Sequence, residues 1–343
     1  MLEKEELPFT DLLGRKVTYA ISQKYYEGFD LFLGQNDSLK FLKSVPDKSV
    51  KLIVTSPPYN IGKVYEERVK LDEYLDYQSQ VAKECVRILR DDGSIAWEVG
   101  NYVYNKEIFP LDFFFYRIFK EQNNMHMRNR IIWRIEHGLH ASLRFSGRYE
   151  TISWFTKTDN YTFNLDPVRI PQKYPGKTHY KQGENYGKPS GNPLGKNPGD
   201  VWDIVVQDWE DQIWNIPNVK ANHPEKTEHP AQFPIELVQR LILALTDEND
   251  MVLDPFGGVG SSALASLLLN RKAISIERDE NYINTTIDRV KAMANGTLKI
   301  RKLGTKVYVP TGKEKVSKIP ESCQQGQHLL HDIKYGYEAR KLG

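Results

Sequence analysis

Cysteine is scarce in this sequence, and long apolar runs and any large excess of charge are missing. Cys85 and Cys323 are the two cysteines among 343 residues, too few for a disulfide framework or a four-cysteine metal site. No apolar run approaches the length of a membrane-spanning helix, and the charged N-terminal stretch lacks a signal-peptide core, so we expect a cytoplasmic protein. With a net charge of +2, the case for a polyanionic partner depends on local clusters of charge.

The residues that are present predict a folded α/β protein. Apolar residues make up 40% of the chain, which argues against disorder, and the length allows one large domain or a domain with an insertion. Residues 38–43 are expected to form a helix ahead of a strand at residues 50–54. Residues 71–99 follow as helix, a turn at residues 91–93 and another strand, and residues 234–292 again alternate helices with strands. This alternation predicts a mostly parallel sheet with helices on both faces.

Residues 164–225 break this pattern. They are rich in Pro, Gly, Asn, Lys, Tyr and Trp and have no sustained period. A stretch of this length without regular structure is usually functional or disordered, and its aromatic residues argue against disorder. We interpret it as an inserted recognition region, the alternative being an ordered loop that packs on the core. Its basic residues are Arg169, Lys173, Lys177, Lys181, Lys188 and Lys196.

The stretch TSPPY, residues 55–59, ends an apolar strand with two prolines and an aromatic ring. Proline has no backbone N–H and pushes the preceding residue out of the helical region. Ser56 and Pro57 are therefore expected to be extended, with backbone carbonyls that the sheet leaves unpaired. Taken alone, the motif is also compatible with a plain strand end and a packed tyrosine.

A second motif, DPFGGVGSS at residues 254–262, joins a strand to a helix. Its glycines allow a sharp bend and the close approach of a ligand, and Ser261 or Ser262 is expected to cap the helix. The spacing is neither that of a dinucleotide loop nor that of a phosphate loop, which disfavours NAD and ATP. Glu277 ends the next strand 23 positions after Asp254 (277 minus 254), a separation at which an acid commonly binds ribose hydroxyls. The two features predict a nucleoside cofactor site.

Together the two motifs resemble those of the DNA amino-methyltransferases, Rossmann-like enzymes that use S-adenosylmethionine. The SPPY motif precedes the glycine loop with a variable region between them, which is the order of that family's beta group. Protein glutamine methyltransferases have the opposite order. The segment EHPAQFPIELVQRLI is similar to the one that precedes the family's cofactor loop, and the likeness covers roughly residues 28–100 and 225–292.

The resemblance implies a Rossmann-like methyltransferase fold with the catalytic motif placed before the cofactor loop. The expected organisation is a catalytic part at residues 28–163, a target-recognition insertion at 164–225, a cofactor-binding part at 226–295 and a basic C-terminal extension at 296–343.

The resemblance also implies a role for individual residues. A target base would flip out of duplex DNA and stack on Tyr59, while Ser56 Oγ and the Pro57 carbonyl accept its two amino hydrogens. No metal and no covalent enzyme intermediate are expected. The implied catalytic residues are Ser56, Pro57, Pro58 and Tyr59. The implied S-adenosylmethionine-binding residues are Asp37, Asp254, Phe256, Gly257, Gly258, Gly260, Ser261 and Glu277. The implied DNA-binding residues are Arg169, Lys173, Lys177, Lys181, Lys188 and Lys196.

The target base is predicted less directly. In the family, Ser at the first motif position goes mainly with cytosine N4 and Asp mainly with adenine N6, so Ser56 favours cytosine. A serine hydroxyl can serve either base, and adenine N6 stays an alternative. RNA or protein methylation and a non-catalytic DNA-binding relative are more remote alternatives. Double-stranded DNA is the implied partner, and a second copy of the chain and a restriction endonuclease of the same system could also be partners.

Overall fold

The computed structural model describes residues 5–25, 28–62, 68–135, 141, 143–172, 176–202, 219 and 223–301. These residues all belong to one compact unit, Met1–Thr305. Lys173, Cys323 and the extension from residue 302 onward lie outside the described residues.

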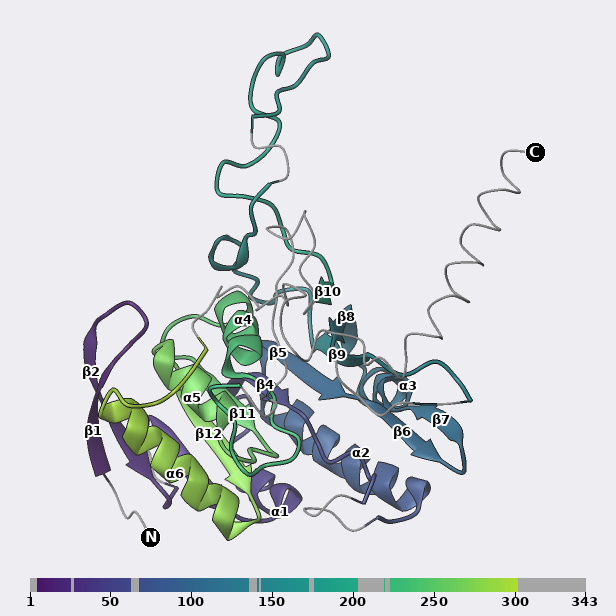
Figure 1. Ribbon diagram of the computed structural model, residues 1–343, viewed down its shortest axis with the longest axis vertical. Coiled ribbons are helices and arrows are strands. Elements are labelled where there is room, and N and C mark those ends of the chain that lie inside the picture. The colour runs from purple at the N-terminus through teal and green to yellow at the C-terminus, as the bar shows by residue number, and fades with distance from the viewer. Residues whose placement is uncertain are drawn as a thin grey trace, which may run out of the picture. The chain divides into compact units, whose positions relative to one another are not determined.

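A ten-stranded sheet forms the centre of this unit, in the order β1-β2-β3-β12-β11-β4-β5-β9-β8-β10 (Figure 1). Neighbours from β2 to β5 are parallel, while β1 and β9 run antiparallel to their neighbours. The predicted mostly parallel α/β fold is therefore confirmed. The strands of this sheet are β1 (Glu5–Thr10), β2 (Lys16–Ser22), β3 (Leu31–Gln35), β4 (Val50–Thr55), β5 (Leu89–Val99), β8 (His126–Arg134), β9 (Tyr149–Thr156), β10 (Val201–Trp202), β11 (Met251–Asp254) and β12 (Lys272–Glu277).

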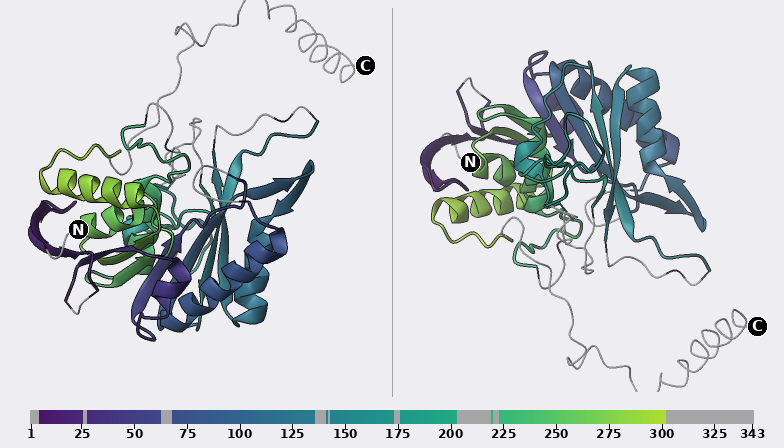
Figure 2. Two further views of the ribbon diagram at one scale, coloured as in Figure 1. Left: turned by 90° about the horizontal axis from the view of Figure 1, so that it is seen from below. Right: turned by 90° about the horizontal axis from the view of Figure 1, so that it is seen from above.

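Helices cover both faces of the sheet, and a small hairpin follows β5 (Figure 2). The helices are α1 (Ser38–Leu42), α2 (Leu71–Ile88), α3 (Leu111–Arg117), α4 (Ile235–Leu245), α5 (Ser261–Leu268) and α6 (Glu280–Ala294), with a π-helical turn at Ile118–Gln122 and a 3-10 turn at Asp166–Val168. The hairpin consists of β6 (Asn101–Tyr104) and β7 (Glu107–Pro110). Among the residues with a described structure, no helix combines the length and the apolar character needed to cross a membrane.

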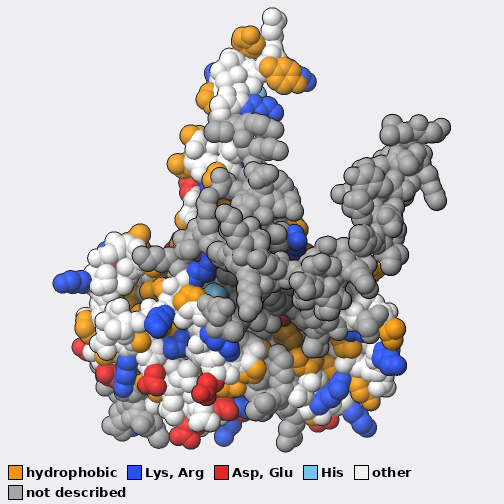
Figure 3. Space-filling model, in the orientation of Figure 1, with side chains coloured by type: hydrophobic (Ala, Val, Ile, Leu, Met, Phe, Trp, Pro, Cys, Tyr) orange, Lys and Arg blue, Asp and Glu red, His pale blue; other side chains and the backbone are white. Residues whose placement is uncertain are grey.

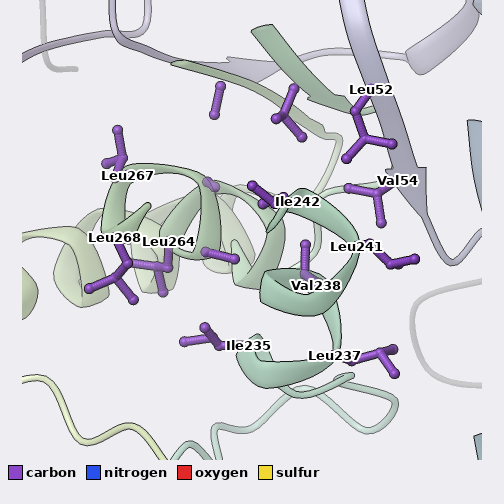
Figure 4. Close-up of a cluster of buried hydrophobic side chains, with 14 of the residues drawn as sticks. Leu52, Val54, Ile235, Leu237, Val238, Leu241, Ile242, Leu264, Leu267 and Leu268 are labelled. Carbon is purple, nitrogen blue, oxygen red and sulfur yellow. The ribbon is translucent and has the colours of Figure 1, made fainter. Parts of the chain in front are cut away.

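Alternate residues of the central strands serve opposite faces of the sheet. Leu52 and Val54 of β4 belong to the apolar cluster that contains α4, α5 and α6, whereas Ile53 belongs to the cluster that contains α1, α2 and α3. Figure 4 shows Leu241 and Ile242 of α4 facing Leu52 and Val54. This two-residue period is what a strand buried on both faces requires.

The sheet reverses its direction of growth between β4 and β11. From β11 the chain passes through α5 to β12 on one side, whereas from β4 it passes through α2 to β5 on the other side. In open α/β sheets, the crevice outside the carboxyl ends of such neighbouring strands is the usual ligand site. Both sequence motifs follow directly after these two strands.

The turn predicted at residues 91–93 is wrong, because these residues lie inside β5. The pairing of β4 with β5 contains a register shift between Val50 and Leu52, and this irregularity lets β5 continue past the expected turn. Gly93 permits the close approach, since an added Cβ would lie 2.8 Å from the Lys51 carbonyl oxygen. The sheet also includes strands that precede residue 28, where the predicted catalytic part begins. These strands form the β1–β2 hairpin, which lies beside α6.

Asp254 joins the two motif-bearing strands to the following helix. Its carboxylate accepts hydrogen bonds from Thr55 Oγ1 at 2.6 Å, from Ser262 Oγ at 2.6 Å and from the Phe256 amide at 3.0 Å. The side chain is 1% exposed, and this burial raises the pKa of Asp254 to about 6. The predicted serine cap of α5 is wrong, because Gly260 is the N-cap and the Ser262 hydroxyl is bonded to Asp254 instead.

We expect Asp254→Ala to lower the free energy of unfolding by about 3 kcal/mol or more, because it leaves two buried hydroxyl donors and the part-buried Phe256 amide without an acceptor. Urea unfolding followed by circular dichroism measures this loss. A loss below about 1 kcal/mol would show that water or a rearranged neighbour replaces the carboxylate.

The pH dependence of stability provides a second check. The pKa of Asp254 is raised from 3.8 to about 6 in the folded protein, so its stabilising contribution is complete below the lower value and is lost as the pH rises through the higher one. Asp254→Asn cannot ionise. The stability of wild type relative to this variant should therefore fall between about pH 4 and pH 6, and a difference that does not change with pH would contradict the assignment.

Candidate active site

A cavity of about 720 Å³ lies where the carboxyl ends of the central strands meet. Its lining contains the whole SPPY motif and most of the predicted cofactor residues, although the two motifs are about two hundred positions apart in the chain. The predicted site residues in the lining are Asp37, Ser56, Pro57, Pro58, Tyr59, Phe256, Gly257, Gly258, Ser261 and Glu277.

Two predicted cofactor residues are absent from this lining. Asp254 lies behind the glycine loop and holds it through the hydrogen bonds described above. Gly260 has φ +79°, and an added Cβ would lie 2.4 Å from Thr286 Cγ2. Both residues therefore shape the loop from behind rather than bordering the cavity.

The glycine loop is fixed by the strand beside it. The Gly257 amide donates to the Ile276 carbonyl at 2.7 Å, and the Gly258 amide donates to Glu277 Oε2 at 2.9 Å. A Cβ at Gly257 would lie 2.0 Å from Ser275 Oγ, so a larger residue there would move the loop. The other Glu277 oxygen accepts from the Arg278 and Asp279 amides at 2.9 Å each, and burial raises the pKa of Glu277.

Asp37 lines the cavity at the start of α1. Its carboxylate caps the helix by accepting from the Lys40 amide at 2.9 Å and also accepts from the Tyr77 hydroxyl at 2.9 Å. Burial and this hydrogen bond to Asp37 raise the pKa of Tyr77 to about 12, so the phenol stays a donor. Ser38 donates to the Pro255 carbonyl, which ties α1 to the glycine loop.

The SPPY segment is held on both sides of its aromatic ring. The Tyr74 hydroxyl of α2 donates to the Pro58 carbonyl at 2.7 Å. Beyond the motif, the Asn60 side chain donates to the Val69 carbonyl at 2.9 Å and accepts from the Val69 amide at 2.8 Å. These contacts engage the Pro58 carbonyl and leave the Pro57 carbonyl without a donor among the described residues.

Tyr59 reaches a buried glutamate that the sequence analysis missed. Its hydroxyl donates to Glu98 of β5, with oxygen–oxygen distances of 2.9 and 2.8 Å, and lies 3.0 Å from Ser56 Oγ. Glu98 is 5% exposed. Burial and then the nearby Glu150 raise the pKa of both Tyr59 and Glu98 well above their usual ranges. The available signal was a glutamate inside the apolar strand SIAWEV.

Two buried polar atoms of residues that line the cavity have no hydrogen-bond partner among the described residues. Gln78 of α2 is 2% exposed, and its Oε1 has no hydrogen-bond partner among the described residues. Ser261 Oγ, at the first turn of α5, is likewise buried without a partner there. Unsatisfied buried groups are costly, so both fit a polar molecule such as S-adenosylmethionine. Within the described part of the chain, no group of three or more His, Cys, Asp or Glu residues could hold a metal ion.

Residues 170–172 and 176–196 form an arm that projects from the core (Figure 1). Backbone pairing of Ile170 with Lys196 closes its base, and a second bridge joins Thr178 to Pro189. The exposed arm carries Lys177, Lys181 and Lys188 together with two exposed tyrosines, Tyr180 and Tyr186, and Figure 3 shows apolar and basic side chains at its tip.

Arg169 lies at the base of the arm and is bonded to Asp166 at 2.7 Å and to the Gly195 carbonyl at 3.0 Å. None of the described basic residues predicted to bind DNA lines the cavity.

A doubly wound, mostly parallel sheet whose carboxyl edge joins an SPPY strand end to a glycine loop defines a Rossmann-like methyltransferase fold. The family model of the N6/N4-type DNA methylases matches residues 50–288. The chain therefore belongs to this family of DNA methylases.

Individual proteins agree with this assignment. The chain is 47% identical to the Type II methyltransferase M.BglII of Bacillus subtilis, over 72% of this chain and 65% of that protein. It is 32% identical to the DNA adenine methyltransferase YhdJ of Escherichia coli (strain K12), over 74% of this chain and 80% of the relative. Among solved structures, the PvuII DNA methyltransferase, described as cytosine-N4-specific, has a TM-score of 0.57 at 21% identity and covers 78% of this chain and 93% of its own.

The adjacent serines of the loop provide a matched pair for testing the cavity. Ser261→Ala removes the unpaired hydroxyl and should weaken S-adenosylmethionine binding by about fivefold, for one lost hydrogen bond, without lowering stability. Ser262→Ala removes the hydrogen bond to Asp254 and should lower the free energy of unfolding by about 2 kcal/mol. Titration calorimetry and urea unfolding measure the two effects, and equal effects of both variants on stability would contradict the assigned roles.

Proposed function

We propose that the protein is a sequence-specific DNA methyltransferase that transfers a methyl group from S-adenosylmethionine to the exocyclic amine of a flipped base, with cytosine N4 favoured. The observation that carries this proposal is the shared cavity, whose lining includes both the SPPY motif and the glycine loop. Membership of the DNA methylase family supports the same reaction class.

The cofactor half of the cavity suits a nucleoside that carries a charged sulfur. S-Adenosylmethionine supplies an electrophilic methyl group on its sulfonium. Glu277 borders the cavity at the end of β12, where its carboxylate can accept from ribose hydroxyls. The first amides of α5 and the Ser261 hydroxyl lie beside the loop, and Gln78 offers an amide oxygen from α2. These groups would hold the cofactor by hydrogen bonds on several sides.

The SPPY half of the cavity suits a planar base with an amino group. An exocyclic amine is a poor nucleophile because its lone pair is delocalised into the ring. Two acceptors, Ser56 Oγ and the Pro57 carbonyl, would favour a pyramidal nitrogen whose lone pair points at the methyl group. The prolines and the Tyr74 contact to the Pro58 carbonyl fix these acceptors before the substrate arrives. Tyr59 would stack on the base and hold it in the cavity.

The proposed target base, cytosine, follows from Ser56. Serine at the first motif position favours cytosine N4 by resemblance, and the PvuII enzyme is described as cytosine-N4-specific. The related YhdJ protein is named as an adenine methyltransferase, which keeps adenine N6 as the second candidate.

Analysis of the methylated nucleosides distinguishes cytosine N4 from adenine N6 as the target. Unmethylated DNA is incubated with the protein and isotopically labelled S-adenosylmethionine, then digested and examined by mass spectrometry. N4-methylcytosine is the expected product, and N6-methyladenine would retain the mechanism but reject the assignment of Ser56 to cytosine. The absence of label in DNA, with label in RNA or protein, would reject the proposed substrate.

Tyr59→Ala should remove roughly 1 to 3 kcal/mol of stacking energy between the ring and the base, which lowers turnover by about 5- to 150-fold. Binding of S-adenosylmethionine should stay nearly intact. Glu277→Ala should have the opposite effect and weaken the binding of S-adenosylmethionine before it affects turnover. Steady-state kinetics on DNA and calorimetry with the cofactor separate the two. A Tyr59→Ala protein that also loses cofactor binding would show that the ring mainly supports the cavity.

The arm is the proposed contact with double-stranded DNA. Replacing Lys177, Lys181 and Lys188 by alanine should reduce the slope of log affinity against log salt by about 2.7, or 0.9 for each lost phosphate contact. The matched control replaces the exposed Lys16, Lys83 and Lys291 of the core, which removes the same charge. Equal slopes for both variants would assign the effect to net charge and not to the arm. A second copy of the chain and a restriction endonuclease remain predicted partners.

A further inference from the structure

A short chain of hydroxyl groups leads from the cavity into the protein interior. Ser56 Oγ lies 3.0 Å from the Tyr59 hydroxyl, which lies 2.9 and 2.8 Å from the two carboxyl oxygens of Glu98. Ser56 and Tyr59 line the cavity, whereas Glu98 is absent from its lining and buried in β5. Glu98 has no role in the methyl transfer described above.

The carboxylate sets the direction of the hydrogen bonds in this chain. A phenol has one hydrogen to donate, and Tyr59 lies within reach of both Glu98 oxygens. When Tyr59 donates to Glu98, the Ser56 hydroxyl must be the donor to Tyr59. Ser56 lines the cavity, and with its hydrogen donated inward its oxygen can accept from an amine there.

Glu98 is the buried member of a carboxyl pair whose other member, Glu150, is half-buried. Glu150 of β9 is hydrogen-bonded to Glu98 and raises the pKa of its carboxyl, after burial itself, whereas Ser56 and Tyr59 act in the opposite direction. Two carboxyl groups this close share a proton, because both cannot ionise at little cost. Gly100 makes room for the arrangement, since an added Cβ would lie 3.1 Å from Tyr59 Cε2 and 3.6 Å from Glu150 Cγ.

The proposed reaction needs a proton acceptor. When the amine nitrogen forms a bond to the methyl carbon and the sulfur–carbon bond breaks, the sulfonium becomes a neutral thioether and the nitrogen takes up its positive charge. The neutral methylated base appears only when an N–H bond also breaks.

We propose that the Glu98–Glu150 pair accepts this proton, through the hydroxyls of Ser56 and Tyr59. The inference rests on the proposed function and extends it. The amine proton passes to Ser56 Oγ, the Ser56 proton passes to the Tyr59 oxygen, and the Tyr59 proton passes to the Glu98 carboxylate. One N–H bond breaks and one carboxyl O–H bond forms, so the charge lost by the sulfonium is balanced by the carboxylate. Release of the proton to water completes the cycle.

Single-turnover methylation of DNA at saturating S-adenosylmethionine tests this assignment. Glu98→Gln keeps the shape of the side chain but removes its charge, and should slow methyl transfer by about 100-fold, as loss of a general base typically does. Tyr59→Phe keeps the stacking ring and removes the bridging hydroxyl, and should also slow the step. Because the groups act as one unit, the double variant should be no slower than the slower single variant.

Glu150→Gln distinguishes a role in proton transfer from a purely structural role, because only the first would change the pH dependence of the rate. The groups acting on the Glu98 carboxyl are Glu150 from β9 and Ser56 and Tyr59 from the segment after β4. With one acid fewer beside it, Glu98 ionises at lower pH, so the acid limb of the pH–rate profile should shift to lower pH. An unchanged limb would overturn the assignment of the pair.

Binding measurements separate this inference from the function on which it rests. Calorimetric S-adenosylmethionine affinity within about twofold of wild type shows that each variant is folded. Wild-type rates in both Glu98→Gln and Tyr59→Phe would overturn the proton path while leaving the methyltransferase reaction in place. A wild-type protein that methylates no DNA would instead reject the proposed function.

Discussion

The hydrogen bonds to buried Asp254 hold together the two halves of the candidate site. β4 and β11 pair directly at only two positions, Leu52 with Val252 and Ile53 with Leu253. The Thr55–Asp254 bond extends this contact to the strand ends, one residue before the SPPY motif, and the Ser262–Asp254 bond adds the helix that follows the glycine loop. A small displacement of either strand would separate the two motifs, so the geometry of the cavity depends on this carboxyl group.

The sequence predicted the parts of the fold that have a local signal. The alternation of strands with helices predicted the mostly parallel sheet, the paired prolines and the glycine loop marked the two motifs, and the family and fold class are confirmed. The register shift in β5 has no such signal, because it depends on how Val50 and Leu52 pair with a distant strand. Gln78 and Glu150 were missed for the same reason, since only the folded sheet and α2 bring them to the SPPY segment, whereas Glu98 had a signal in the apolar strand SIAWEV.

The acids around the cavity have a shared electrostatic effect. Asp254, Glu277 and Glu98 are all buried, and burial raises the pKa of each. Hydrogen bonds from amides and hydroxyls offset part of this cost. Of the three, Glu277 borders the cavity, and its ionised carboxylate attracts a positively charged ligand more strongly than a neutral one of the same shape. The sulfonium form of the proposed cofactor would thus be preferred over the thioether that remains after methyl transfer.

The arm differs from the cavity in how it is attached to the fold. Its two ends meet where Ile170 pairs with Lys196, and most of the described residues between them are exposed. Insertions, deletions and substitutions beyond that pairing leave the core hydrogen bonds untouched. The arm can therefore change in length and sequence between related proteins without altering the cavity, so that the two parts of the fold can diversify at independent rates.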